Sequence, residues 1–514
     1  MFPSTLIILV ALVSVTFASV LSKRDVIDDC LAAAKVPYNT HNSSQWKADA
    51  SPFNVRIPFV PASIAVPLTT EHIQAAVKCG RDNGVKVTPK CGGHSYANFG
   101  FGGEDGHLML ELDHMYNVTV DNHTGIATVQ AGSRLGHIVT ELHKQGNKAF
   151  SHGTCPGVGI AGHILHGGFG MSSFTKGLAL DWLVGAKVVL ANSTVVTVSE
   201  KEHSDLFWAL KGAGSSLGVV SEFHIQTYDE PKQVTSLTIT LPWNATQAVE
   251  GFRNLQTWAD TSMPKELNLR LSISTFGTNL EGNFYGNREG LKTVIEPLVE
   301  MLGGRYTSET TDWLGNVQHF ANMPLDQTNE YKYVSYVPGP LTSFHPNADM
   351  AMQQENFYSN SLYSDKLSDS QIESFVRYWF TTGRSLGRYW WIQVDFHGGK
   401  KSAIAERNAN SSSYAYRGKF FLYQFYDLVN LSAKYPKDGF SFLQGFIETI
   451  TNGTQLDKQA KYFNYPDTTL GQNEAQAMYW GENLAKLQQI KAAVDKDEVF
   501  YFPQSVRPTS LAGV

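Results

Sequence analysis

The sequence has few charged residues and no long run of apolar or basic residues. Charged residues make up 17% of the 514, below the ~25% typical of soluble domains, and the formal net charge is −6. No basic run is longer than two residues, which argues against nucleic acid or an anionic membrane as the main partner. Beyond the amino terminus, no apolar stretch reaches the ~20 residues that a membrane-spanning helix needs. The 22 tyrosines and 10 tryptophans instead suit a neutral polar ligand.

Residues 1–24 have the pattern of an export signal followed by a short processing segment. An apolar core from Leu6 to Val15 precedes the small residues Ala18 and Ser19, as in a secretory signal peptide. Lys23 and Arg24 match a dibasic processing site, so we expect a secreted, extracellular mature protein. Eight Asn-x-Ser/Thr sequons predict glycosylation at several positions: Asn42, Asn117, Asn122, Asn192, Asn244, Asn410, Asn430 and Asn452.

Cysteine is scarce, with four residues in the whole chain. Four cysteines allow three pairings, among which a sequence cannot choose. Cys30 and Cys79 lie in helix-like polar surroundings, whereas Cys91 and Cys155 lie in glycine-rich segments. We favour a Cys30–Cys79 disulfide, which leaves two thiols to be explained in an oxidising compartment.

The hydrophobic patterns predict two α+β units. In the first, residues 70–84 and 134–145 predict helices, and polar turns at 121–125 and 192–193 predict hairpins. From about residue 231, alternating segments at 267–276, 390–396 and 418–426 are mixed with helical ones, which predicts an antiparallel sheet covered by helices. One long helix is expected at 472–493.

Three short motifs match known sites without the structural context that those sites need. Residues 157–162 fit G-x-G-x-x-G with Asp181 downstream, but no buried strand precedes them, which disfavours a dinucleotide site. Ser216 fits G-x-S-x-G, yet the predicted order is helix then strand, the reverse of a nucleophile elbow. His163 and His166 have no carboxylate near them in sequence, so hydrogen-bonding loop histidines are favoured over a metal site.

Two glycine-rich segments carry reactive side chains. The first, KCGGHSY at 90–96, follows a predicted strand, and its two glycines let the backbone approach a ligand closely beside His94. The second, CPGVGIAGHILHGGFG at 155–170, places Cys155 before successive glycine amides, a pattern typical of anion cradles. Either segment alone is compatible with a glycine-rich turn, but together they predict a cofactor site.

In the second unit, polar and aromatic residues alternate along predicted strands. A period of two places the members of each such row on one face of their strand. The rows are Trp391, Gln393 and Asp395; Asn268, Arg270 and Ser272; and the position of Gln424. Tyr462 and Tyr465 lie three residues apart in the segment YFNYPD. A solvated edge strand and packed core tyrosines are the alternatives to a binding groove.

These segments together resemble the berberine-bridge-enzyme-like branch of the vanillyl-alcohol-oxidase flavoprotein family, and most of all its fungal carbohydrate oxidases, such as glucooligosaccharide and chitooligosaccharide oxidase. The resemblance covers nearly all of the mature chain and includes GGHSY, CPGVGIAGHILHGGFG, GLALDWLVGAKVVLA, DLFWALKGAGSSLGVVSEF, YFNYPD and FPQSV. It implies an α+β fold of the vanillyl-alcohol-oxidase type. A two-part FAD-binding domain at 25–230, completed by about 470–514, would accompany a substrate-binding domain at 231–469.

The resemblance also implies FAD attached twice, through His94 at the 8α-methyl group and through Cys155 at C6, which leaves Cys91 as a buried free thiol. No metal is expected. Val158 matches family members that react with oxygen, which predicts hydrogen peroxide as a product. The remaining cofactor contacts implied by the family are Gly92, Gly93, Ser95, Pro156, Gly157, Val158, Gly159, Gly162, His163, Gly167, Gly168, Val220, Tyr462 and Asn464.

By the same resemblance, Tyr465 is the catalytic base and Asp395 supports it. Sugar contacts are implied at Tyr96, Arg270, Trp391, Gln393 and Gln424. The expected protein is a secreted monomeric oxidase that converts the reducing-end C1 hydroxyl of an oligosaccharide to a lactone, then an aldonic acid, while O2 is reduced to H2O2. Two alternatives remain open: a flavin-dependent oxidase of a secondary metabolite on the same fold, and a carbohydrate-binding protein without a cofactor.

Overall fold

The computed structural model describes residues 25–322, 325, 354–451, 453–455 and 458–509. The predicted signal segment 1–24 and the sequon at Asn452 lie outside these residues. Within them, no helix combines the length and the apolar character that crossing a membrane requires. Cys30 and Cys79 form a disulfide, and Cys91 is a buried free thiol, so both of these predictions are confirmed.

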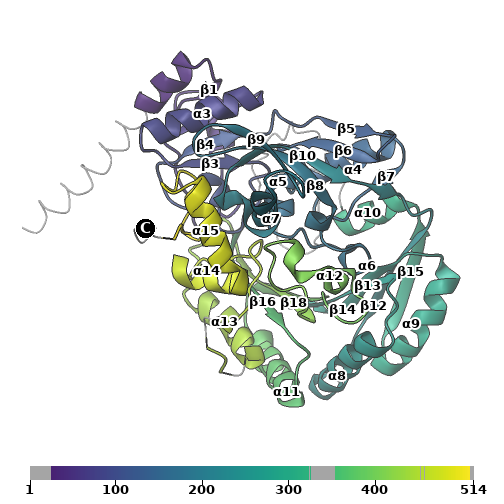
Figure 1. Ribbon diagram of the computed structural model, residues 1–514. Helices are drawn as coiled ribbons and strands as arrows, with labels where there is room; N and C mark the ends of the chain where they lie inside the picture. The colour runs from purple at the N-terminus through teal and green to yellow at the C-terminus, as the bar shows by residue number, and fades with distance from the viewer. Residues whose placement is uncertain (1–24, 323–324, 326–353, 452, 456–457, 510–514) are drawn as a thin grey trace, which may run out of the picture.

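Two sheets lie in the upper half of the molecule as drawn in Figure 1. The first has the order β1-β2-β4-β3, and β4 runs parallel to both β2 and β3. The second is antiparallel, with the order β5-β6-β10-β8-β9. Their strands are β1 Tyr38–Asn39, β2 Ser63–Ala65, β3 Val87–Lys90, β4 Leu108–Glu111, β5 Val118–Asp121, β6 Ile126–Gln130, β8 Leu183–Val189, β9 Val195–Ser199 and β10 Val219–Gln226. The predicted hairpins are β5–β6 and β8–β9.

Helices pack against these two sheets through one apolar cluster. The predicted helix at 70–84 is α3, Thr70–Asp82, and its first turn is capped by the Thr69 side chain, which accepts a hydrogen bond from the His72 amide. Other helices of this cluster are α4 Leu135–Lys144, α5 Ile160–Ile164 and α7 Ser204–Ala213. The helix α2 Trp46–Asp49 packs through Trp46 in a separate cluster with Ile64 and Met109, and Phe174 of α6 Ser173–Lys176 belongs to another cluster. The short strands β7 Lys148–Ala149 and β11 Tyr228–Asp229 pair with each other.

A seven-stranded antiparallel sheet forms the lower half, as predicted from the alternating segments. Its order is β15-β12-β14-β13-β17-β18-β16. The strands are β12 Val234–Thr240, β13 Leu267–Ser274, β14 Gly277–Phe284, β15 Arg305–Thr311, β16 Asn356–Ser364, β17 Tyr389–Phe396 and β18 Phe421–Val429. One face carries the apolar side chains of a second core, which is covered by α8 Ala245–Thr261, α9 Arg288–Leu302, α11 Asp369–Tyr378 and α13 Asp438–Thr451.

The opposite face of this sheet is turned toward the upper sheets, because the helices occupy only the apolar side. Along β17, the buried residues Trp390, Ile392 and Val394 point to the helix side. The alternate residues Trp391, Gln393 and Asp395 therefore share the inner face, as the period of two predicts. Two further short helices, α10 Trp313–Ala321 and α12 Ala403–Glu406, lie beside the sheet.

The single long helix predicted at 472–493 is wrong. The chain forms α14 Gln472–Trp480 and α15 Leu484–Val494, separated at Gly481. Gly481 has a φ of +46°, a conformation that ends a right-handed helix and that glycine adopts without a steric cost. Because of this break, α15 packs on α7 beside the upper sheets (Figure 1).

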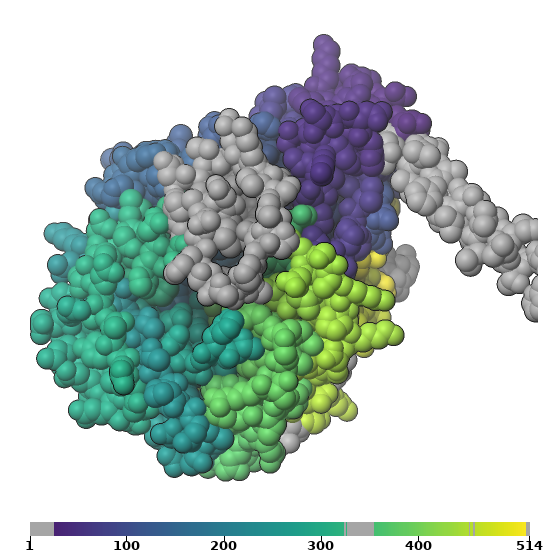
Figure 2. Space-filling model, turned by 180° about the vertical axis from the view of Figure 1, so that it is seen from behind, coloured from purple at the N-terminus to yellow at the C-terminus, as the bar shows by residue number. Residues whose placement is uncertain are grey.

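Segments far apart in sequence close the molecule on its other side. Asn54 and Arg56 both donate hydrogen bonds to the Phe357 carbonyl, at 3.2 and 2.7 Å. The Arg56 guanidinium also lies 5.3 Å from the centre of the Phe440 ring. In Figure 2 the purple N-terminal part accordingly lies against the yellow-green residues of the α13 region.

Candidate functional site

A cavity of about 1570 Å³ extends between the upper sheets and the inner face of the lower sheet. It is lined by side chains from the loop after β3, the glycine-rich segment at 153–170, the strands β13, β17 and β18, and the segment 462–465. Most of the predicted site residues line it: Gly92, Gly93, His94, Ser95, Tyr96, Cys155, Val158, Gly159, Gly162, His163, Val220, Arg270, Trp391, Gln393, Gln424, Tyr462, Asn464 and Tyr465. Pro156, Gly157, Gly167, Gly168 and Asp395 are not among the residues that line it.

The two glycine-rich segments contact each other backbone to backbone. A Cβ atom on Gly92 would lie 2.3 Å from the Gly159 amide nitrogen, and one on Gly159 would lie 2.3 Å from the Cys91 sulfur. No side chain fits at either position, since real Cβ contacts do not come below 3.0 Å. The glycines thus bring the loop of His94 and the loop of Cys155 to the same wall of the cavity.

Arg134 joins these two loops, and the sequence analysis did not identify it. Its guanidinium donates hydrogen bonds from Nη1 to the carbonyl oxygens of Gly92, at 2.7 Å, and of Gly157, at 2.8 Å. Arg134 is 3% exposed, so these charge-assisted bonds form away from water, where they are strong. The only local signal was its position at the start of the predicted helix 134–145, where it became the N-cap of α4.

His94 and Cys155 reach the cavity in different surroundings. The His94 ring lies 4.8 Å from the ring of Phe53, centroid to centroid. Cys155 is half-buried, and burial raises the pKa of its thiol. Cys91, in contrast, is buried, with its thiol directed at the Ser133 carbonyl at 3.6 Å.

The histidines of the glycine-rich segment are held by hydrogen bonds. His163 Nε2 accepts the Gly153 amide at 2.9 Å, and His166 Nδ1 donates to the Gly162 carbonyl at 3.0 Å. Burial lowers the pKa of His163 to about 3 and that of His166 to about 4, so both rings are neutral at pH 7. Among the described residues, no three His, Cys, Asp or Glu side chains gather as metal ligands would.

In the other two motif matches, Asp181 and Ser216 interact with residues of the surrounding fold. Asp181 forms an ion pair with Arg417 at 2.6 Å, with both side chains 3% exposed, so its carboxylate is engaged away from the cavity. Ser216 Oγ accepts the Val506 amide at 3.1 Å and precedes β10, as the predicted order of helix then strand requires.

The polar rows of the lower sheet meet in register. Arg270 on β13 pairs with Asp395 on β17, and Gln393 pairs with Ser272 on one side and Gln424 on the other. Gln424 Nε2 donates to the Tyr96 hydroxyl at 2.8 Å, which links the sheet to the loop of His94. Trp391 stacks on Tyr426 at 4.7 Å and 11°. The result is a groove floor of amides and aromatic rings.

Tyr462 and Tyr465 approach from the segment after β18. The Tyr462 hydroxyl oxygen accepts hydrogen bonds from the amides of Gly168, at 3.0 Å, and Phe169, at 3.2 Å. Tyr465 lies between Tyr96, stacked at 5.9 Å, and Tyr462, edge-on at 5.0 Å. Burial, and next the negative charge of Asp395, raise the pKa of Tyr465 well above 10.

Glu355 is a second residue that the sequence analysis missed. It lines the cavity and accepts a hydrogen bond from the Tyr426 hydroxyl. Tyr426 lies two residues after Gln424 on the same strand face, so alternation was a usable signal for it. Glu355 directly precedes β16 and forms an isolated parallel bridge with Asn54, and no local sequence pattern marks it.

Two family models match this chain. One is described as an FAD binding domain and matches residues 61–199. The other is described as berberine and berberine like and matches residues 461–507.

Characterised relatives match almost the full length. The chain is 47% identical to a glucooligosaccharide oxidase of Sarocladium strictum, over 97% of each chain. It is 47% identical to a xylooligosaccharide oxidase of Thermothelomyces thermophilus, over 95% of this chain and 96% of that one. It is 41% identical to a chitooligosaccharide oxidase of Gibberella zeae, over 98% of each chain.

Solved structures match equally well. The xylooligosaccharide oxidase of Myceliophthora thermophila, in complex with xylobiose, superposes with a TM-score of 0.87 at 46% identity, over 95% of this chain and all of that one. The glucooligosaccharide oxidase of Acremonium strictum superposes with a TM-score of 0.87 at 46% identity, over 94% and 99%. The flavin of that second protein is a 6-S-cysteinyl, 8α-N1-histidyl FAD.

Proposed function

This chain belongs to the berberine-bridge-enzyme-like FAD-linked oxidases, and we propose that it oxidises the reducing-end C1 hydroxyl of oligosaccharides. It is an FAD-dependent oligosaccharide oxidase of the vanillyl-alcohol-oxidase fold. In the proposed reaction, the C1 carbon and its hydroxyl lose two electrons and two protons to give a lactone, O2 takes them up as H2O2, and water opens the lactone to an aldonic acid. The observation that carries the proposal is that one cavity has in its lining His94, Cys155, Tyr462, Tyr465 and the paired glutamines Gln393 and Gln424.

The residues present fit FAD. The cavity is larger than the 300–1,000 Å³ usual for a drug-sized ligand, which suits a dinucleotide and a sugar together. Gly92 and Gly159 leave no side chain between the two loops that carry His94 and Cys155. We assign the two covalent attachments to these residues, by analogy with the cysteinyl and histidyl linkages of the Acremonium enzyme. Bound FAD supplies the hydride acceptor and returns the electrons to O2.

Tyr465 is the proposed base for the C1 hydroxyl proton. Because its pKa lies well above 10, Tyr465 is protonated at pH 7. It can accept the C1 hydroxyl proton only if its own hydroxyl proton moves to another group in the same step. Asp395 is the proposed support. Its buried Oδ2 has no hydrogen-bond partner among the described residues, while Oδ1 accepts the Arg270 Nε hydrogen bond at 2.7 Å. A carboxylate oxygen without a partner is suited to stabilise a proton leaving Tyr465 Oη.

The floor of the groove is the proposed sugar site. Gln393 and Gln424 offer amide groups to sugar hydroxyls, and Trp391 offers an aromatic face to the apolar side of a pyranose ring. Tyr96 is held by Gln424, so its ring has a fixed place beside Tyr465. Arg270 lines the same region with its charge balanced by Asp395. A neutral sugar suits this balance better than a charged one.

Secretion is proposed from three observations. Residues 1–24 have the pattern of a signal peptide, and Cys30–Cys79 is a disulfide, which persists in oxidising compartments. All seven sequon asparagines in the described residues are exposed, as glycosylation requires: Asn42, Asn117, Asn122, Asn192, Asn244, Asn410 and Asn430.

The test separates the cofactor from the reaction. Acid-precipitated protein should keep its yellow colour, and peptide mapping should locate flavin on His94 and Cys155. His94→Ala and Cys155→Ala should each retain flavin through the other residue, and Cys91→Ala, the matched thiol control, should retain both attachments. Flavin that stays in the supernatant would overturn the covalent assignment.

The activity is tested by measuring peroxide release with mono- and oligosaccharides. Sugar-dependent H2O2 together with an aldonic acid product is the expected result. A flavin-loaded enzyme that releases no peroxide from any sugar would contradict the proposal and favour an oxidase of a secondary metabolite.

A further inference from the structure

The hairpin between β13 and β14 exposes an aromatic ring at the rim of the cavity. Phe276 is 78% exposed, the highest value among the exposed large apolar side chains of the described residues. It lines the cavity together with Thr275, its neighbour in the same turn. An aromatic ring left in water at the entrance to a binding site gains stability when a ligand covers it, because apolar surface is removed from water.

Phe276 does not stand alone. Its ring stacks on Tyr389 at 5.3 Å and 30°, and Tyr389 also lines the cavity. Tyr389 is the first residue of β17 and is half-buried, so the strand holds one ring of the pair while the Phe276 ring stays exposed. The two stacked rings form an aromatic platform with an open apolar side.

The platform lies on the same strand face as the proposed catalytic groups. Residues 389, 391, 393 and 395 alternate on the inner face of β17, so the face leads from Asp395 at the base through Gln393 and Trp391 to Tyr389 at the rim. At about 3.4 Å per residue, the path from Asp395 to Tyr389 is roughly 20 Å long. A single sugar ring bound beside Tyr465 would cover only the inner part of it.

The chemistry of the lining changes along this path. Next to Tyr465, the groove offers amides and a charged pair, which suit the polar edge of the reacting sugar. Trp391 follows, stacked on Tyr426, and then the platform of Phe276 and Tyr389. Leu428 pairs with Tyr389 across β17 and β18 and also lines the cavity, so an apolar side chain lies beside the platform. This order suits a chain of rings whose flat apolar faces are bound and whose terminal hydroxyl alone reacts.

We propose that Phe276 and Tyr389 form an outer subsite that binds a pyranose ring of the non-reducing part of the oligosaccharide, while the reducing end reacts at Tyr465. The inference rests on the proposed function and deepens it, because it assigns the binding of a second part of the sugar chain to one pair of residues. The occupant is a ring of the same sugar chain, since the platform and Tyr465 line one continuous cavity.

The test compares chain lengths. Phe276→Ala should raise KM for cellotetraose about 5-fold, the order expected for the loss of one aromatic contact, and leave kcat unchanged. KM and kcat for glucose should both stay at the wild-type values. Phe276→Trp, which keeps an aromatic ring at this position, should retain the wild-type KM for cellotetraose. Met301→Ala, which removes another exposed apolar side chain on α9, is the matched control and should change nothing.

Three results would overturn the subsite. The first is an equal change in KM for glucose and cellotetraose, and the second is no change for either. The third is a wild-type dimer that becomes a monomer in Phe276→Ala, measured by light scattering, because the ring would then bind a second copy of the chain. KM and kcat of the same variants are measured in parallel with xylose, xylobiose and xylotetraose.

Failure of the proposed function is distinguishable from failure of the subsite. If the wild type oxidises no sugar, titration calorimetry with cellotetraose and xylotetraose still compares binding to the wild type and Phe276→Ala. Weaker binding to the variant supports the subsite, and equal or undetectable binding to both proteins overturns it.

Discussion

Arg270 and Asp395 face each other across β13 and β17, and Arg270 Nε donates a 2.7 Å hydrogen bond to Asp395 Oδ1. The two side chains are 9% and 1% exposed, so the pair is held at low dielectric beneath the cavity. Burial raises the pKa of Asp395 above 3.8, even though Arg270 acts in the opposite direction. The same carboxylate raises the pKa of Tyr465. Burial first, and then the charge of Asp395, therefore keep the proposed base protonated.

Asp395 should control the acid limb of the pH–rate profile. Burial raises the pKa of Asp395 above 3.8. The carboxylate therefore becomes protonated as the pH falls through this raised pKa, and kcat/KM should fall with it. Asp395→Asn combined with Arg270→Gln removes both charges and should abolish this limb. Tyr465→Phe should lower kcat about 10²–10⁴-fold at every pH and keep bound flavin.

The double variant is preferable to Asp395→Asn alone, because a buried Arg270 charge without its partner destabilises the fold by about 3–5 kcal/mol. Stopped-flow flavin reduction by cellobiose between pH 4 and 9 provides the measurement. Wild-type rates in Tyr465→Phe, or an unchanged acid limb in the double variant, would refute these roles.

The contact between the two glycine-rich loops predicts that alanine changes the free energy of unfolding at Gly159 but not at Gly162. Gly159→Ala places a Cβ 2.3 Å from the Cys91 sulfur and should destabilise the protein by about 1–3 kcal/mol, or more. Gly162→Ala meets nothing within 4 Å and should keep the wild-type free energy of unfolding.

Chemical denaturation of both variants measures the difference, and flavin absorbance per chain is the second readout. Gly162→Ala with normal stability and reduced flavin content would indicate that the cofactor approaches this backbone closely. Equal stability of Gly159→Ala and the wild type would show that the loops can separate without cost.

A buried charge network holds the segment of Tyr462 and Tyr465, and its loss should impair the enzyme. Asp467 accepts hydrogen bonds from Tyr358 Oη at 2.7 Å and Asn360 Nδ2 at 2.8 Å, and it pairs with Lys461 at 3.6 Å. Lys461 and Asp467 are 1% and 4% exposed at their side chains. Asp467→Asn leaves the Lys461 charge uncompensated and should cost about 3–5 kcal/mol.

The matched control is Asp205→Asn, which removes the exposed partner of Lys486 and should have no measurable effect on unfolding. Because Asp467 positions Tyr465 without lining the cavity, the variant should lower kcat more than it raises KM at a temperature where it stays folded. A normal kcat would mean that the tyrosines keep their places without this network.

Buried neutral histidines predict a loss of stability in acid. Burial lowers the pKa of His397 to about 4, against about 6.5 in the unfolded chain. The contribution of neutral His397 to the free energy of unfolding is therefore complete above pH 6.5. It is lost as the pH falls from 6.5 toward 4, by about 1.4 kcal/mol per pH unit. His152, His163 and His166 act in the same direction.

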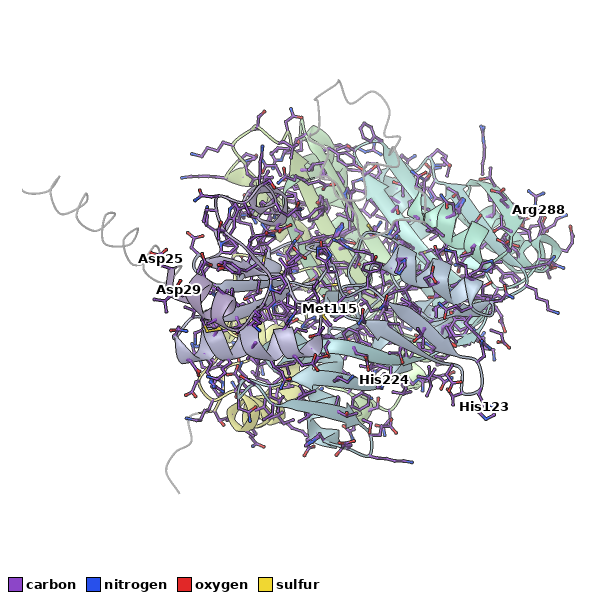
Figure 3. All side chains as sticks on the ribbon, turned by 90° about the horizontal axis from the view of Figure 1, so that it is seen from above. Asp25, Asp29, Met115, His123, His224 and Arg288 are labelled. Atoms are coloured by element: carbon purple, nitrogen blue, oxygen red, sulfur yellow. A yellow bond between two sulfur atoms is a disulfide. The ribbon has the colours of Figure 1, made fainter. Side chains whose placement is uncertain are left out.

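His397→Gln should make the fall shallower, because glutamine can still donate to the Lys419 carbonyl and accept from the Tyr414 hydroxyl without titrating. His123→Gln is the control, since His123 is exposed at the edge of the molecule (Figure 3) and should leave the slope unchanged. Urea unfolding at half-unit steps between pH 4 and 7.5 measures both slopes. Identical slopes for His397→Gln and the wild type would contradict the prediction.

Local patterns in the sequence were sufficient for the features that depend on neighbours in the chain. The hairpins β5–β6 and β8–β9, the helix α3 and the shared face of Trp391, Gln393 and Asp395 follow from periodicity and turn chemistry. The predicted helix at 472–493 failed because its break at Gly481 depends on a backbone conformation that an isolated glycine does not specify.

Tertiary structure alone decided the contacts between distant segments. Arg270 and Asp395 are 125 residues apart, and Arg134 lies 42 residues from Gly92. Such pairs depend on strand register and on the packing of one sheet against another, which no local pattern encodes. The stacking of Phe276 on Tyr389 is of the same kind, since it joins a hairpin turn to the start of a strand more than 100 residues later. The sequence by itself therefore determined which residues are proposed to carry the chemistry, and the packing of the sheets decided which of them line one cavity.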